Sequence, residues 1–294
     1  MARSYGASHP TIEFPIGVFA PAVFPERGRS GAGVLQEAPC REMAMVRNLP
    51  AVKDQGVLPV CSAVVSLTLY EQLLLREGLM ALPTDRGLTI KAPVELGWGW
   101  VYLSGRRILE DKDTLSLGQG QVREQLLSGL PLRLALQGLI ERGVLTASDG
   151  LYLNDPVRLQ AQLAELQHSP RGMLAVPLRV LSVLPTIEAL YDVVSSQYAV
   201  GFAFAIDPVI DAWMHSPSAQ EETEYELPAP QEGSPRLATH AAVITAIDVR
   251  AQRATVQNSF GSSFGIMGFF FVPFGLLLRS DFSGLQFFVL VRAA

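Results

Sequence analysis

Cysteine, histidine and charged residues are all scarce in this chain. Its 294 residues include two cysteines, Cys40 and Cys61, which are too few to build a disulfide-stabilised scaffold. A single disulfide between them stays open as the alternative to two thiols. The four histidines and two cysteines have no metal-ligand spacing, so the sequence predicts neither a metal site nor a cofactor.

The charge balance excludes one large class of partners. Charged residues make up 17% of the chain and the formal net charge is −5, which gives no electrostatic basis for binding nucleic acid. No stretch reaches the ~18 apolar residues that cross a bilayer, so no membrane span is predicted. Pro15, Pro21 and Pro25 interrupt the apolar stretch near the N-terminus, which is unlike a signal peptide. We therefore expect a cytoplasmic protein, or one delivered without a conventional signal peptide.

Apolar residues are plentiful, at 49% of the chain, and their spacing changes along it. Helical patterns come first and strand patterns later, which predicts an α+β fold with two lobes. Helices are expected over residues 62–77, 94–109, 131–142, 155–166 and 186–196, and strands over 198–206, 240–247, 254–258, 268–272 and 286–291.

The same patterns suggest how the chain is divided. Residues 1–44, rich in Pro, Gly and aromatic residues, are expected to form an extended arm that packs on the body or on a neighbouring molecule. Residues 45–180 form the predicted helical lobe and 181–294 the β-rich lobe. Residues 216–237 are rich in Pro, Glu, Ser and Gln, which is typical of an inserted loop.

The helix expected over residues 62–77 is apolar on most of its faces, so it should be buried. Cys61 stands at its N-terminus, where the helix dipole and the unpaired N–H groups favour a thiolate. A buried cysteine before an apolar helix is more often part of a core, so Cys61 alone is weak evidence of chemistry. Other residues change this interpretation.

Three polar side chains have the types that a thiol nucleophile needs. Gln55 precedes Cys61 by six positions, His240 starts an apolar strand, and Asn258 follows His240 by eighteen positions. A histidine can act as the base of a cysteine nucleophile, an asparagine can orient that histidine, and a glutamine can donate to an oxyanion. The alternative for His240 is a satisfied histidine in the core.

The local sequences around these residues resemble those of the papain-like cysteine peptidases. The motifs are Val-Lys-Asp-Gln-Gly at residues 52–56, His-Ala-Ala-Val at 240–243 and Asn-Ser-Phe-Gly-Ser-Ser-Phe-Gly at 258–265. The resemblance covers roughly residues 45–278 and is weak in the middle. It implies a helical left lobe and a β-barrel-like right lobe with the active-site cleft between them.

The resemblance also implies roles for individual residues. Cys61 would be the nucleophile, His240 its base, Asn258 the group that orients His240, and Gln55 an oxyanion donor. In addition, Gly129 corresponds to a glycine whose backbone pairs with substrate. Phe260, which replaces a tryptophan, would cover the His240–Asn258 hydrogen bond and border the substrate.

The chain departs from the family around the nucleophile. The upstream cysteine and the aromatic residue after the nucleophile are both absent, and Ser62 in the latter position is expected to loosen the packing. Pro59 removes one backbone donor from the turn. His240 follows Cys61 by 179 positions, more than the roughly 130–150 of the family, which the predicted insertion can explain. Only residues 1–44 precede the match in this sequence, so the long prosegment of the family is not expected here.

Three functions remain open from the sequence. The first is a cysteine peptidase that cleaves peptide or isopeptide bonds in a peptide or protein substrate. The second is a catalytically weak or inactive module with a structural or binding role, in which the N-terminal arm docks on a neighbour in a larger assembly. The third keeps the same acyl-enzyme step but transfers the acyl group in transglutamination, or deamidates.

Overall fold

A computed structural model describes residues 17–18, 42–56, 58–79, 96–110, 129–144, 176–216 and 225–293, and every structural statement below concerns these ranges. The helix expected over residues 155–166 lies outside them, as do Cys40 and most of the predicted arm. Strand β1 (Gly17–Val18) lies within the predicted arm and β2 (Met43–Met45) spans its end, and both pair with strands of the main sheet.

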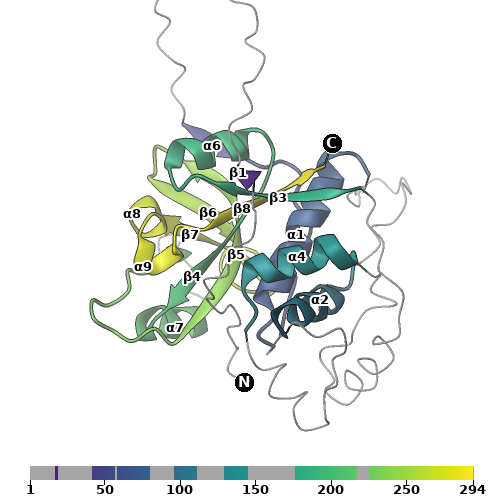
Figure 1. Ribbon diagram of the computed structural model, residues 1–294. Helices are drawn as coiled ribbons and strands as arrows, with labels where there is room; N and C mark the ends of the chain where they lie inside the picture. Colours follow the sequence, from purple (N-terminus) through teal and green to yellow (C-terminus); the bar gives the residue numbers. More distant parts are fainter. Residues whose placement is uncertain are drawn as a thin grey trace, which may run out of the picture.

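The expected α+β fold is confirmed, with helices first and strands later (Figure 1). The helices are α1 (Cys61–Arg76), α2 (Trp98–Glu110), α4 (Leu132–Arg142), α6 (Ile187–Ser195), α7 (Pro208–His215), α8 (Phe274–Leu277) and α9 (Ser280–Ser283). The longer strands are β3 (Leu178–Val183), β4 (Val200–Ile206), β5 (Ala238–Asp248), β6 (Arg253–Gln257), β7 (Phe269–Pro273) and β8 (Phe287–Arg292).

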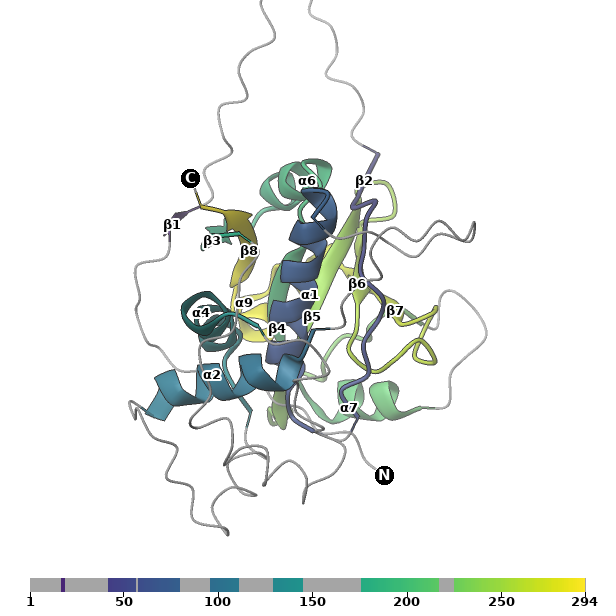
Figure 2. The ribbon, with the colours of Figure 1, turned by 90° about the vertical axis from the view of Figure 1, so that its right-hand side faces the viewer.

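One sheet joins all of these strands, in the order β1-β3-β8-β4-β5-β6-β7, with β2 paired to β5. Apart from the parallel β1–β3 pair, all neighbouring strands are antiparallel. Helices α1, α2 and α4 gather on one side of this sheet, and α6, α7, α8 and α9 lie around its other margins (Figure 1). Helix α1 packs against the long central strands β4 and β5 and also against β8 (Figure 2).

Helix α1 is buried along nearly its whole length, as its apolar sequence predicts. Every residue from Cys61 to Leu75 is buried. Gly201 of β4 allows the close approach, because a Cβ there would stand 2.9 Å from Leu69 Cδ1 and 3.1 Å from Val65 Cγ1. Since alternate residues of a strand share a face, α1 lies on the face of β4 that carries Gly201, Ala203 and Ala205.

Two elements depart from the sequence-based expectation. Strand β3 falls in a stretch for which no element was expected. Helix α7 lies between the expected strand over residues 198–206 and the predicted insertion over 216–237, where no helix was expected. The signal for α7 is present in the sequence, because Asp207 caps the helix and Pro208 occupies its first turn. Part of the predicted insertion packs against the sheet. Leu227 is buried, and its N–H donates to Phe271 O of strand β7.

Asp207 ties the insertion to the sheet. Its Oδ1 accepts from Ile210 N at 2.8 Å, and its Oδ2 accepts from Gln231 N and Ser234 Oγ, both at 2.8 Å. Burial by itself would raise the pKa of Asp207, but the hydrogen bonds outweigh it and hold the pKa below its usual value. Both carboxylate oxygens therefore serve the structure.

Helices α2 and α4 touch backbone to backbone where Gly105 meets Gly138. A Cβ at Gly138 would lie 2.4 Å from Gly105 N and 2.7 Å from Ser104 C, which is closer than the atoms can approach. The packing of α2 on α4 thus depends on a small residue at this crossing, because backbone atoms cannot move aside as a side chain can.

We predict that Gly138→Ala lowers the free energy of unfolding by about 1–3 kcal/mol, the usual cost of forcing extra volume into a packed core. Gly275→Ala is the matched control, because Gly275 has open space around its Cα and lacks a positive φ. Urea denaturation of both variants measures the difference. Equal midpoints for the two variants would contradict the close α2–α4 contact.

We also predict that Asp207→Asn is less stable than the wild type at pH 7 by about 1–2 kcal/mol, because it loses the acceptor of a helix cap or of the insertion. A carboxylate with a depressed pKa contributes stability that is lost as the pH falls through its folded pKa, so the gap should narrow below about pH 4. Asp248→Asn, at a turn where one oxygen accepts from Ala251 N, is the control. A gap independent of pH would refute the role of the charge.

Candidate active site

Cys61 is the first residue of α1, and its sulfur meets strand β5. The Sγ atom accepts a hydrogen bond from Ala241 N at 3.4 Å, so the thiol lies against the residue that follows His240. The helix starts without a side-chain cap. Its first N–H groups therefore have no acceptor from that source, and together with the helix dipole they favour a negative sulfur.

The imidazole of His240 is held by an asparagine. His240 Nε2 and Asn258 Oδ1 are 2.7 Å apart, and Ser259 N donates to the same oxygen at 2.8 Å. Because an amide oxygen can only accept, the proton of the neutral ring lies on Nε2 and the lone pair on Nδ1. An imidazole in this tautomer is able to take a proton from a thiol through Nδ1.

Two aromatic rings enclose this imidazole. Phe204 meets it edge to face at a centroid distance of 5.5 Å, and Phe260 lies at 4.9 Å. His240, Phe204 and Phe260 are all completely buried, and Asn258 is 4% exposed. The rings exclude water from the His240–Asn258 hydrogen bond, which strengthens it in a medium of low dielectric constant. This is the position that the sequence predicted for Phe260.

Gln55 is fixed in the same network. Its Nε2 donates to Leu58 O at 2.7 Å, its Oε1 accepts from Ser259 Oγ at 2.5 Å, and its N–H donates to Ser259 O at 2.9 Å. The segment before α1 is therefore tied to the segment after β6. Ser259 is a positioning residue that the sequence analysis did not single out, although it lies within the Asn-Ser-Phe-Gly motif.

Lys53 and Glu71 form a second link that the sequence analysis missed. Lys53 Nζ pairs with Glu71 Oε2, and the two side chains are 16% and 6% exposed. Lys53 lies two residues before Gln55, and Glu71 lies within α1. The pair thus anchors the Gln55 segment to the helix that carries Cys61. An isolated charged residue in an apolar helix, as Glu71 is, was the available signal.

Ser62 does not loosen the packing as expected. It is completely buried, and its Oγ donates to Leu130 O at 2.5 Å. This bond brings the segment that contains Gly129 to the N-terminus of α1. Gly129 is half-buried and precedes Leu130 directly, so its backbone lies near the start of the helix. The structure therefore gathers Gln55, Cys61, Gly129, His240 and Asn258 in one region.

The thiol and the imidazole are both inaccessible to solvent. Cys61, His240 and Gln55 each have a relative exposure of 0%. In the described state a substrate carbonyl has no path to the sulfur. Any reaction at Cys61 thus requires that the surrounding structure opens first.

Two further features are absent from the described ranges. No group of three or more potential metal ligands occurs there. None of the helices in those ranges has the length and the apolar character needed to cross a bilayer.

No protein-family model and no curated protein matches the chain by sequence. Solved structures do match its fold. Xylellain, a cysteine protease from Xylella fastidiosa, has a TM-score of 0.67 and 13% identity, over 99% of this chain and 97% of that one. Digestive procathepsin L 3 from the larval midgut of Tenebrio molitor has a TM-score of 0.51 and 14% identity, over 88% of this chain and 72% of that one. The ragweed pollen allergen Amb a 11, a cysteine protease in its proform, has a TM-score of 0.52 and 12% identity, over 88% and 69%. The chain therefore has the α+β fold of papain-like cysteine proteases.

We predict that Lys53 and Glu71 are strongly coupled. Removing one partner leaves a poorly hydrated charge, so Lys53→Met and Glu71→Leu should each lower the free energy of unfolding by about 3 kcal/mol. The double variant should lose much less than the sum, because no charge is left without its partner. Urea denaturation of all four proteins tests this cycle, and additive losses would show that the two residues act separately.

Proposed function

We propose that the protein is a cysteine peptidase that cleaves peptide or isopeptide bonds through Cys61, His240, Asn258 and Gln55. The observation that carries this proposal is the hydrogen bond from Ala241 N to Cys61 Sγ, which brings the thiol to the strand of a histidine already oriented by Asn258. The papain-like fold supports it, since the solved structures it resembles are cysteine proteases.

Acylation uses both nitrogens of the ring. His240 Nδ1 takes the thiol proton, and the Cys61 sulfur forms a bond to the carbonyl carbon of the substrate. The negative oxygen of the tetrahedral intermediate receives hydrogen bonds from Cys61 N–H and from the Gln55 amide, whose NH₂ carries two hydrogens. The carbon–nitrogen bond then breaks, and the Nδ1 proton passes to the leaving amine.

Deacylation repeats these steps with water. His240 removes a proton from the attacking water, the new carbon–oxygen bond forms, and the carbon–sulfur bond breaks to restore the thiol. If an amine replaces water, the same acyl-enzyme gives transglutamination, so the second nucleophile alone distinguishes the two reactions. Asn258 keeps the ring in one tautomer throughout.

The proposal includes the division of the chain made from the sequence. The nucleophile comes from the helical lobe (about 45–180) and the base from the β-rich lobe (about 181–294). Gly129 would pair with the substrate backbone on the helical side, and Phe260 would border the leaving group. Opening between the two lobes would then expose both reacting groups together.

A catalytically weak structural or binding module is the second candidate. The complete burial of Cys61 and His240 favours it, because an enzyme at rest usually leaves its nucleophile some access to substrate. In this alternative the N-terminal arm mediates assembly with a neighbour. The two candidates differ in whether Cys61 ever forms a thiolate–imidazolium pair.

Iodoacetamide labelling of the full chain between pH 5 and 9 separates the candidates. For the peptidase, we expect Cys61 to be alkylated already at about pH 6, well below the ordinary thiol pKa of about 8.5. His240→Ala should slow labelling at pH 6 by at least about tenfold, since the neutral thiol hardly reacts. Mass spectrometry of the labelled peptide identifies the residue, and Cys61→Ala is the control for labelling of Cys40.

Labelling under about 2 M urea, still below the unfolding transition, distinguishes a closed enzyme from an inert module. A closed enzyme should gain reactivity that depends on His240 as the site opens. A Cys61 that reacts only near its ordinary pKa and ignores His240 under both conditions would contradict the peptidase.

A further inference from the structure

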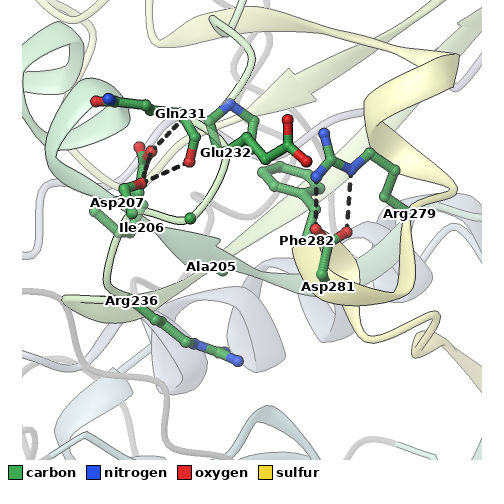
Figure 3. A pocket seen from close by; sticks show the side chains of 12 residues that line it. Ala205, Ile206, Asp207, Gln231, Glu232, Arg236, Arg279, Asp281 and Phe282 are labelled. Carbon is green, nitrogen blue, oxygen red and sulfur yellow. Dashed lines mark hydrogen bonds and ion pairs between the residues drawn. The ribbon is translucent and has the colours of Figure 1, made fainter.

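The charged side chains around the pocket between the insertion and α9 are mostly engaged with other protein groups (Figure 3). Asp207 accepts from two residues of the insertion, and Arg279 donates to both oxygens of Asp281. Such bonds hold the pocket together and leave few polar groups for a ligand. A polar contact directly beside the nucleophile lies elsewhere, in the helical lobe, and is made by Ser62.

Ser62 follows the nucleophile and joins two segments of the helical lobe. It is the second residue of α1, it is completely buried, and its Oγ donates to Leu130 O at 2.5 Å. The two residues are 68 positions apart, so the bond fixes a distance that the covalent backbone leaves free. Because a buried hydroxyl without a partner is costly, the folded chain is constrained to keep this contact.

Other hydroxyls of α1 bond within their own helix. Ser66 Oγ donates to Ser62 O at 2.8 Å, and Thr68 Oγ1 donates to Val64 O at 2.9 Å, each to the carbonyl one turn back. This is the usual bond of a serine or threonine inside a helix. Ser62 has no helical residue one turn back, since α1 begins at Cys61. Its hydroxyl therefore serves the contact between segments.

Leu130 is fixed through both its side chain and its carbonyl. The side chain is completely buried where α2 meets α4, since a Cβ at Gly105 would stand 2.6 Å from Leu130 Cδ2. The carbonyl is held by Ser62. Pro131 follows directly and restricts Leu130 to an extended conformation. The backbone at this point is thus tied to the start of α1.

The constraint on Leu130 extends to Gly129. The carbonyls before and after an extended residue point in opposite directions, so Gly129 O is directed away from the Ser62 hydroxyl that holds Leu130 O. In the proposed reaction, the backbone of Gly129 pairs with the substrate. Any shift of Leu130 O relative to α1 would therefore move this substrate-pairing group relative to Cys61.

We propose that Ser62 is a positioning residue, whose hydrogen bond to Leu130 O sets the distance between the Gly129 backbone and the sulfur of Cys61. The first residue of α1 attacks the carbonyl and the second places the peptide. This role rests on the proposed peptidase function, and it concerns peptides, because a small acyl compound does not reach Gly129. It also explains a serine where the papain-like family has an aromatic residue, since a hydrogen bond takes over from ring packing.

A peptide and a small ester together test this role. The peptide is one that the wild type cleaves in an internally quenched library with mixed residues on both sides of the cleaved bond. The ester is p-nitrophenyl acetate, whose two-carbon acyl group acylates a thiol without contacting Gly129. Ser62→Ala should lower kcat/KM for the peptide by at least about tenfold, because a small misplacement of a bound substrate has effects of this size. It should change kcat/KM for the ester by less than about twofold. Rates with Cys61→Ala are subtracted as background.

Ser66→Ala is the matched control. It removes a buried hydroxyl and its bond to a backbone carbonyl from the same helix, but that carbonyl belongs to α1 itself. This variant should keep the wild-type ratio of peptide to ester activity. Urea denaturation verifies that both variants remain folded.

The outcomes separate the role of Ser62 from the peptidase assignment. Equal losses on both substrates in Ser62→Ala would show that Ser62 acts on Cys61 itself, and would overturn the positioning of Gly129. Unchanged rates, or a selective loss that Ser66→Ala shares, would overturn it too. These three results leave the peptidase intact. If the wild type cleaves no peptide of the library, the peptidase is refuted and the positioning role with it.

Discussion

The packing of α1 onto the face of β4 and β5 is the contact on which the rest of the site depends. The glycine at position 201 favours it, because a Cβ there would stand 2.9 Å from Leu69 Cδ1 and the Leu69 side chain would have to shift. The same contact brings the first residue of the helix, Cys61, to Ala241. The packing of this one helix therefore brings the thiol of Cys61 to the strand that carries His240, 179 positions further along the chain.

Hydrogen bonds then fix the orientation of the groups that packing has brought near. Asn258 sets the tautomer of His240, and Ser259, the next residue, holds Gln55. Two adjacent residues after one strand thus orient both the proposed base and the proposed oxyanion donor. Such a network is stiff because its members are buried, and a buried polar group that loses its partner is costly. The burial that stabilises the network also closes it to substrate.

The sequence predicted the elements with strong periodicity and missed those whose signal is local. Helix α1 and strands β4 to β8 were expected close to where they lie, because long apolar patterns have few alternative structures. Helix α7 was not expected, because it is short and its main signal is the local cap at Asp207 and Pro208. The sequence also could not give the role of Ser62, because whether a buried serine loosens a core depends on an acceptor from elsewhere, here Leu130 O.

The sequence by itself determined the α+β class and the set of polar side chains proposed for catalysis, because residue types and short spacings are properties of the chain. Only the folded chain brings these side chains into one region and pairs Lys53 with Glu71. These relations join residues far apart in sequence. They exist only because the sheet register and the packing of α1 fix distances that no spacing along the chain encodes.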